Sequence, residues 1–130
     1  MFLAPCEEAV RSNPGQWYEM VEEMYRSTPD EYRREVTEKQ KAIGPAVMLS
    51  DFLCCDKFDI MEKVHQIKLP TLIICGESDV MTPVKYASYL GAKIANSKVV
   101  IVPGAGHFVL AEKPEVVNKA IGDFLAGISS

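Results

Sequence analysis

The chain has 130 residues, the size of one ordinary domain, and 48% of them are hydrophobic, which is enough for a folded core. Charged residues make up 25%, an average fraction for a soluble globular protein that does not indicate disorder. With a net charge of −4, nucleic acid and anionic membrane surfaces are poor candidate partners. No apolar run approaches the roughly 20 residues of a membrane span, and the early Glu7 and Glu8 argue against a secretory signal.

Apolar residues recur at helical spacing near the start of the chain. Trp17, Met20, Val21 and Met24 follow this pattern and predict a first helix. Together with Tyr25, this stripe is typical of a helix face in a core. An apolar substrate pocket is the alternative interpretation.

Two further helices and a short helical segment are expected before residue 67. Thr28-Pro29-Asp30 predicts the start of a second helix, which Gly44-Pro45 ends. The basic residues of this helix alternate with glutamates, which indicates a solvated mixed-charge face. A short helical segment is expected from Ile60 to Val64. The third helix is expected to begin at Pro45 and to include Met48, Leu49 and Phe52.

The second part of the chain alternates predicted strands and helices. Thr71–Cys75 and Lys98–Val102 are continuous apolar runs, typical of strands buried on both faces of a parallel sheet. Thr82-Pro83 predicts a helix between the strands, and Pro114 predicts a last helix after them. This βαβα order predicts an α/β fold with parallel strands and a right-handed crossover. Because two strands leave apolar edges unpaired, we expect a homodimer.

Two loops follow the predicted strands and carry the chemically useful side chains. Asp79 lies in the loop of residues 76–83, and His107 lies in the glycine-rich loop of residues 103–108. The carboxyl ends of neighbouring parallel strands meet at one edge of a sheet, so the two side chains are expected side by side. A carboxylate there would fix the tautomer of the imidazole. Without this pairing, His107 is an ordinary loop histidine and Asp79 a residue near a helix start.

The order of these motifs resembles the C-terminal half of the α/β-hydrolase family. From Ile67 to Leu125 the chain shows an I-x-x-P-T-L strand, a G-x-x-D loop, a Pro-started helix, a G-x-G-H loop and an E-x-P-E helix. The resemblance implies that Asp79 is the triad acid and His107 the general base. Cys54–Asp59 resembles the return from the family's helical cap. The resemblance therefore implies a cap-like segment at 1–66 and a core portion at 67–130.

The nucleophile of that family is missing from the pattern. The G-x-S-x-G elbow raises a serine above the sheet, and no such pattern occurs in residues 1–130. Ser78 lacks the elbow spacing and is interpreted as a turn serine. Because nucleophile, base and oxyanion donors act as a unit, we expect this chain alone to be inactive or nearly so.

Two functional hypotheses follow. In the first, the chain is the C-terminal portion of an ester or acyl hydrolase. In the second, it is a non-catalytic module that binds a small ligand or a protein partner. The motifs do not specify the substrate.

The cysteines and the other histidine predict no cofactor or metal site. With no C-x-x-C pair, free thiols in a reducing cytoplasm are the simplest interpretation. Cys75 ends a predicted strand and is expected in the core, and His65 is expected at the surface. The remaining cysteines are Cys6, Cys54 and Cys55.

Overall fold

A computed structural model of the chain describes residues 12–13, 15, 18–19, 22–23 and 25–128. Its backbone forms two compact units, Met1–Asp59 and Ile60–Ser130. The Tyr89 hydroxyl donates a 3.1 Å hydrogen bond to the Met61 carbonyl, which ties the 3₁₀ helix η1 (Met61–Gln66) to the second unit. A cap-like role for the first unit stays a prediction. The predicted first helix, on Trp17, Met20, Val21 and Met24, lies outside the described residues.

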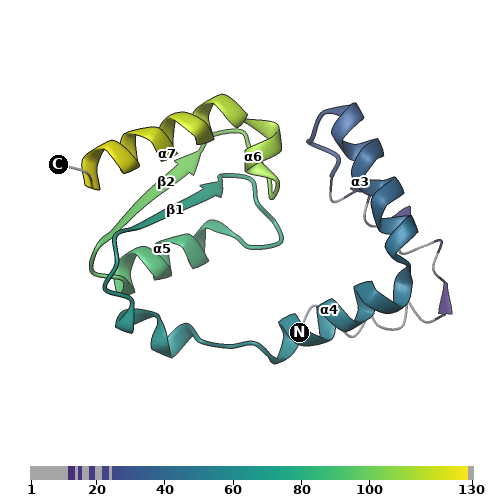
Figure 1. The fold of residues 1–130 in the computed structure, drawn as a ribbon, viewed down its shortest axis with the longest axis horizontal. Helices are drawn as coiled ribbons and strands as arrows, with labels where there is room; N and C mark the ends of the chain where they lie inside the picture. Colours follow the sequence, from purple (N-terminus) through teal and green to yellow (C-terminus); the bar gives the residue numbers. More distant parts are fainter. Residues whose placement is uncertain (1–11, 14, 16–17, 20–21, 24, 129–130) are drawn as a thin grey trace. The chain divides into compact units, whose positions relative to one another are not determined.

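Two helices of the first unit follow the predicted pattern (Figure 1). Helix α3 spans Asp30–Ile43, and helix α4 spans Pro45–Lys57. Gly44 lies between them with a φ of 85°, a backbone angle that residues other than glycine rarely adopt. Pro45 then begins α4 without losing a helical hydrogen bond, because the first N–H groups of a helix have no partner within it.

Helix α3 carries the expected mixed-charge face. Its basic side chains form ion pairs with carboxylates one turn away, and these pairs lie at the surface of the helix. Each exposed pair of this kind contributes only about 0.2–0.5 kcal/mol to helix stability. The pairs are Arg33 with Asp30 at 2.7 Å, Lys39 with Glu35 at 2.6 Å, and Lys41 with Glu38 at 3.0 Å.

The second unit is a parallel strand pair with helices, as the βαβα pattern predicts. Strands β1 (Thr71–Gly76) and β2 (Ser97–Val102) pair in parallel, and α5 (Val84–Lys93) connects them. The pairing runs in register from Thr71 opposite Ser97 to Gly76 opposite Val102. Helix α7 (Pro114–Ile128) follows β2, as expected. A short helix, α6 (Val109–Glu112), precedes α7 and was not predicted.

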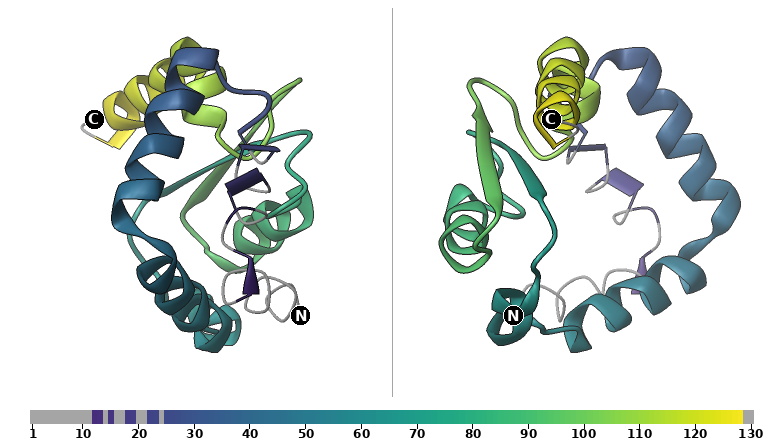
Figure 2. Two further views of the ribbon diagram at one scale, coloured as in Figure 1. Left: turned by 90° about the vertical axis from the view of Figure 1, so that its right-hand side faces the viewer. Right: turned by 60° about the vertical axis from the view of Figure 1, so that its left-hand side comes forward.

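The alternation of side chains along the strands places α5 and α7 on opposite faces of the sheet (Figure 2). On one face, Val102 is 1% exposed and packs in a cluster with Val109 of α6 and Val117 of α7. On the other face, Val99 meets α5 at Gly91, where an added Cβ would lie 2.4 Å from the Val99 Cγ2 atom. The absence of a side chain at Gly91 therefore sets how closely α5 approaches β2.

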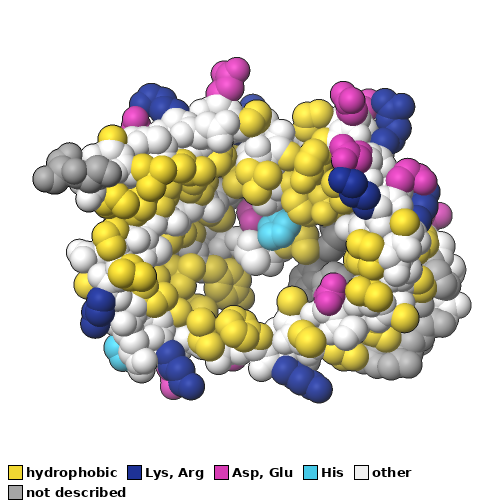
Figure 3. Space-filling view, in the orientation of Figure 1, with side chains coloured by type: hydrophobic (Ala, Val, Ile, Leu, Met, Phe, Trp, Pro, Cys, Tyr) yellow, Lys and Arg dark blue, Asp and Glu magenta, His cyan; other side chains and the backbone are white. Residues whose placement is uncertain are grey.

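Part of the apolar surface of the second unit remains open. Ile121, Leu125 and Ile128 of α7 are 40–52% exposed, and Figure 3 shows hydrophobic side chains gathered along this helix. Each strand of the described sheet has one paired edge. None of the helices in the described part of the chain combines the length and the apolar character of a membrane span.

We predict that the 130-residue chain associates in solution, as a homodimer, because an unpaired strand edge and an exposed apolar helix face favour self-association. Size-exclusion chromatography with light scattering at micromolar concentration should give twice the chain mass of 14.4 kDa. Leu125→Lys should weaken the dimer if the α7 face is covered and should leave it intact if the strand edge is covered. A monomer with a cooperative thermal melt would contradict the prediction.

Candidate active site

Asp79 lies just beyond the carboxyl end of β1, where its carboxylate is surrounded by donors. The side chain is only 4% exposed. Its Oδ1 atom accepts the backbone N–H groups of Met81 at 2.9 Å and Thr82 at 2.8 Å. Its Oδ2 atom accepts the Thr82 hydroxyl at 2.8 Å and the His107 Nδ1 atom at 2.9 Å. An ionised carboxylate offers about four acceptor positions, so this carboxylate is fully hydrogen-bonded.

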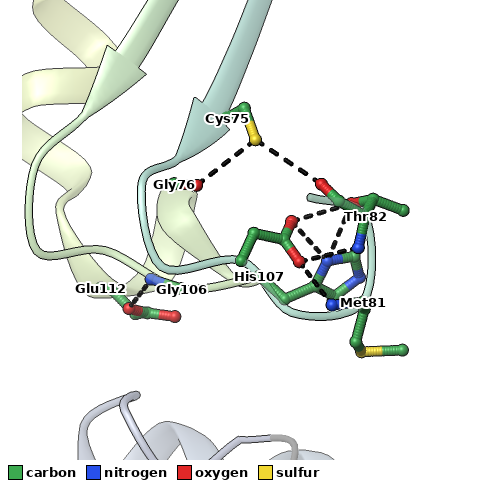
Figure 4. Close-up of polar contacts among 8 residues, drawn as sticks. Cys75, Gly76, Met81, Thr82, Gly106, His107 and Glu112 are labelled. Atoms are coloured by element: carbon green, nitrogen blue, oxygen red, sulfur yellow. Dashed lines mark hydrogen bonds and ion pairs between the residues drawn. The ribbon is translucent and has the colours of Figure 1, made fainter. Parts of the chain in front are cut away.

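His107 lies in the loop that follows β2 (Figure 4). Its Nδ1 atom lies 2.9 Å from Asp79 Oδ2. The structure thus brings together the two residues that the sequence analysis expected side by side. An ionised carboxylate only accepts hydrogen bonds, so the proton lies on Nδ1 and the neutral ring keeps a lone pair on Nε2. The imidazole is 29% exposed and packs edge-on against the Phe108 ring at 5.0 Å. A histidine held in this way can accept a proton at Nε2.

Backbone hydrogen bonds hold the two loops against each other. The Glu77 N–H donates to the Val102 carbonyl at 3.0 Å, and the Ser78 N–H donates to the Ala105 carbonyl at 2.9 Å. The Gly104 N–H donates in turn to the Glu77 carboxylate at 3.2 Å. Ser78 therefore lies in a turn, as expected, and its backbone joins the two loops.

Gly76 is the point of closest approach between the loops. A Cβ atom built on Gly76 would lie 2.1 Å from the Gly106 carbonyl oxygen and 2.4 Å from the Ala105 carbonyl oxygen. Both distances are far inside van der Waals contact, and backbone atoms cannot rotate away as a side chain can. The glycine at the end of β1 therefore allows the His107 loop to lie over the Asp79 loop.

Comparison with known proteins places this fold in a family. Residues 40–128 match the TAP-like protein model of the α/β-hydrolases. The chain belongs to the α/β-hydrolase family. Monoacylglycerol lipase ABHD6 of Mus musculus is 38% identical to it over 72 residues, which are 55% of this chain and 21% of the lipase. The chain thus spans about a fifth of the length of that relative.

Solved structures resemble the α/β-hydrolase chain over most of its length. A thermophilic esterase superposes with a TM-score of 0.80 at 30% identity, covering 93% of this chain and 49% of the esterase. The esterase EaEST from Exiguobacterium antarcticum gives a TM-score of 0.84, covering 94% of this chain and 46% of that one. At 14% identity, the second comparison shows the shared fold alone.

Glu112 supports the His107 loop of this hydrolase chain, a role that the sequence analysis missed. Its Oε2 atom accepts the Gly106 N–H at 2.6 Å. The E-x-P-E motif does not lie within one helix: its first glutamate, Glu112, ends α6, whereas Glu115 lies in the first turn of α7. The E-x-P-E pattern marks the residue, but a charge near a helix start explains the pattern equally well without the loop contact.

Thr82 was expected to open the helix after β1, and here also the structure differs. Helix α5 begins at Val84, with Pro83 in the capping position and no side-chain cap. The Thr82 hydroxyl instead donates to Asp79. An Asp followed three residues later by Thr is the only sequence signal for this contact, and many turns share it.

The electrostatics of the site favour an ionised Asp79. Burial by itself would raise the pKa of Asp79, but the hydrogen bonds from His107 and Thr82 outweigh burial and lower the pKa below its ordinary value. Burial raises the pKa of the nearby Cys75 thiol, and the negative charge of Asp79 adds to this effect. Cys75 is therefore a protonated core thiol at neutral pH, in agreement with its buried position.

The other candidate residues of the sequence lie on other elements, η1 and α4. His65 is exposed on η1, where its Nδ1 atom lies 2.7 Å from the Glu62 carbonyl oxygen, and Cys54 and Cys55 are exposed free thiols. Among the described residues, no three His, Cys, Asp or Glu side chains gather as metal ligands.

An open cavity of about 400 Å³ adjoins Asp79 and His107. Because residues 73–76 of β1 also line it, a further strand paired to β1 would fill part of this space.

We predict that Gly76→Ala lowers the free energy of unfolding by about 1–3 kcal/mol or more, because the new methyl group meets backbone carbonyls. Urea unfolding followed by circular dichroism measures this change. Gly122→Ala in α7 is the matched control: nothing lies within 4 Å of its added Cβ, so it should stabilise the chain by about 0.5–1 kcal/mol. Equal effects of the two substitutions would show that the loops do not require Gly76.

We also predict that Asp79→Asn destabilises the chain at neutral pH and less so in acid. The pKa of Asp79 is lower in the folded chain than in the unfolded chain, so its stabilising contribution is present above the unfolded value and is lost as the pH falls through the folded value. The expected loss is about 2 kcal/mol at neutral pH, and it shrinks as the pH falls below the unfolded pKa of about 3.9. Urea unfolding across this range measures it, and a difference independent of pH would contradict the assignment.

Proposed function

We propose that this chain is the C-terminal portion of an ester or acyl hydrolase, in which Asp79 is the triad acid and His107 the general base. The contact of 2.9 Å between the Asp79 Oδ2 and His107 Nδ1 atoms, at the carboxyl ends of two adjacent parallel strands, carries the proposal. The similarity to a thermophilic esterase at 30% identity and to a monoacylglycerol lipase supports carboxylic esters as the substrate class.

In the proposed reaction, the Nε2 atom of His107 takes the proton of a serine hydroxyl as the oxygen attacks the ester carbonyl. The resulting imidazolium is stabilised by the ionised Asp79 carboxylate at Nδ1. His107 then returns the proton to the leaving alcohol, and in the second half of the cycle it activates water in the same way. The 29% exposure of the His107 side chain leaves the imidazole accessible for this exchange.

The proposal assigns the nucleophile and the oxyanion donors to protein outside these 130 residues, because the chain contains no G-x-S-x-G pattern. A general base without its nucleophile contributes little to the rate, since the members of a triad act together. We therefore propose that the 130-residue chain is inactive by itself. The exposed free thiols Cys54 and Cys55 favour a reducing, cytoplasmic location for it.

The test begins with the DNA upstream of the Met1 codon. If the reading frame continues into a segment with a G-x-S-x-G elbow, the longer protein is expressed and assayed with p-nitrophenyl esters. His107→Ala should lower kcat/KM by about 10³-fold or more, and Asp79→Asn by about 10²–10⁴-fold.

His65→Ala is the matched control, because it removes the exposed histidine of η1. It should leave hydrolysis near the wild-type rate. A longer protein that hydrolyses esters equally well after His107→Ala would exclude the proposal. An in-frame stop upstream, with no turnover by the 130-residue chain, would instead favour the non-catalytic binding module.

A further inference from the structure

We propose that Thr82 is a positioning residue that orients the Asp79 carboxylate and, together with it, keeps the proton of His107 on Nδ1. The inference rests on the proposed function for its catalytic meaning, since it explains how the base would be prepared. Its geometry, however, lies entirely within the described residues.

Thr82 contacts both oxygens of Asp79. Its backbone N–H donates to Oδ1 at 2.8 Å, and its hydroxyl donates to Oδ2 at 2.8 Å. Two donors from one residue, one to each oxygen, fix the plane of the carboxylate and prevent rotation about its terminal bond. With that plane fixed, Oδ2 lies 2.9 Å from the Nδ1 atom of His107.

Thr82 has a single hydroxyl proton, and its position determines which atom donates in the contact between Thr82 Oγ1 and His107 Nδ1. An ionised carboxylate cannot donate, so the hydroxyl proton is directed to Asp79 and the oxygen lone pairs remain available. The Thr82 Oγ1 atom lies 3.3 Å from His107 Nδ1 (Figure 4). Thr82 is thus a second, longer acceptor for the Nδ1–H group.

The three residues therefore form a closed set of contacts with one consistent proton arrangement. Thr82 donates to Asp79, and His107 donates to Asp79 and, more weakly, to Thr82. If the ring proton moved to Nε2, the Nδ1 lone pair would face two acceptor oxygens, which is unfavourable. The lone pair that a general base needs is thereby kept on Nε2, away from Asp79.

The backbone around Thr82 holds the hydroxyl in place. Pro83 follows with a fixed φ and precedes the first turn of α5. The Sγ atom of the buried Cys75 lies 3.7 Å from the Thr82 carbonyl oxygen and 3.4 Å from the Gly76 carbonyl oxygen (Figure 4). Strand β1 and helix α5 thus both constrain the residue between them.

The experiment compares three variants of the 130-residue chain. Thr82→Val removes the hydroxyl but keeps the backbone N–H and the side-chain volume, and Thr82→Ser keeps the hydroxyl. Thr71→Val is the control, because it removes a hydroxyl hydrogen bond of 3.0 Å to the Leu69 carbonyl, away from the site. Nitrogen-15 NMR at alkaline pH reports the tautomer of the neutral imidazole, with the exposed His65 as an internal reference.

The wild type, Thr82→Ser and Thr71→Val should all show the Nδ1–H tautomer at His107. Thr82→Val should show a larger fraction of the Nε2–H tautomer than the wild type, because the Asp79 Oδ2 atom then loses the hydroxyl that holds it toward Nδ1. In carbon-13 NMR, Thr82→Val should also raise the pKa of Asp79 by about one unit, as the loss of one hydrogen bond to a charged group predicts. A Thr82→Val chain with the wild-type tautomer and the wild-type pKa of Asp79 would overturn the proposal.

The circular dichroism spectrum of each variant establishes that it is folded. If Thr82→Val does not fold, Thr82→Ala, which also lacks the hydroxyl, is measured in its place against Thr82→Ser. A tautomer mixture in Thr82→Ser would count against the hydroxyl as the cause. These readouts use neither substrate nor nucleophile, so a negative result would overturn only the role of Thr82. The proposed function would be overturned by a different result, ester hydrolysis that persists after His107→Ala.

Discussion

The in-register parallel pairing of β1 with β2 is the constraint on which the candidate site depends. Because Gly76 lies opposite Val102, the two loops leave the sheet at the same height and on the same edge. Residues 28 positions apart, Asp79 and His107, then need only short loops to meet. The pairing by itself is not sufficient: without a side chain at Gly76, the carbonyls of residues 105 and 106 can approach the end of β1.

The second condition of the site is a buried carboxylate that stays ionised. Burial disfavours the charge of Asp79, and the hydrogen bonds that surround it reverse that preference. The same negative charge helps to keep the neighbouring Cys75 thiol protonated. The ionised Asp79 carboxylate thus accepts the hydrogen bond of His107 and at the same time disfavours a thiolate at Cys75.

Family membership and activity rest on different observations in this protein. The family match and the esterase superposition establish an α/β-hydrolase chain that covers about half of the solved esterase, 49% of its length. The β1 edge without a partner strand in the described sheet and the exposed apolar residues of α7 are surfaces that a further strand or a second chain could cover. Hydrolysis requires a nucleophile and oxyanion donors as well, and no G-x-S-x-G pattern occurs in residues 1–130.

The sequence by itself determined the elements and their order. Continuous apolar runs predicted both strands, and Pro and Gly signals with helical spacing predicted the helices α3, α4, α5 and α7, because backbone preference and burial act on neighbouring residues. The position of Asp79 and His107 on neighbouring loops followed from the carboxyl ends of two neighbouring parallel strands. Their catalytic roles stay predictions, since they came from the family resemblance.

Only the tertiary structure decided how the site is supported. The Thr82 hydroxyl on Asp79 and the Glu112 carboxylate on the Gly106 N–H are contacts of side chains whose sequence context equally fits a helix start. The close approach at Gly76 is likewise invisible in one strand, since it depends on where the other loop folds back. Such contacts depend on distances between segments that the local sequence pattern does not encode, so they emerge only when the loops are packed together.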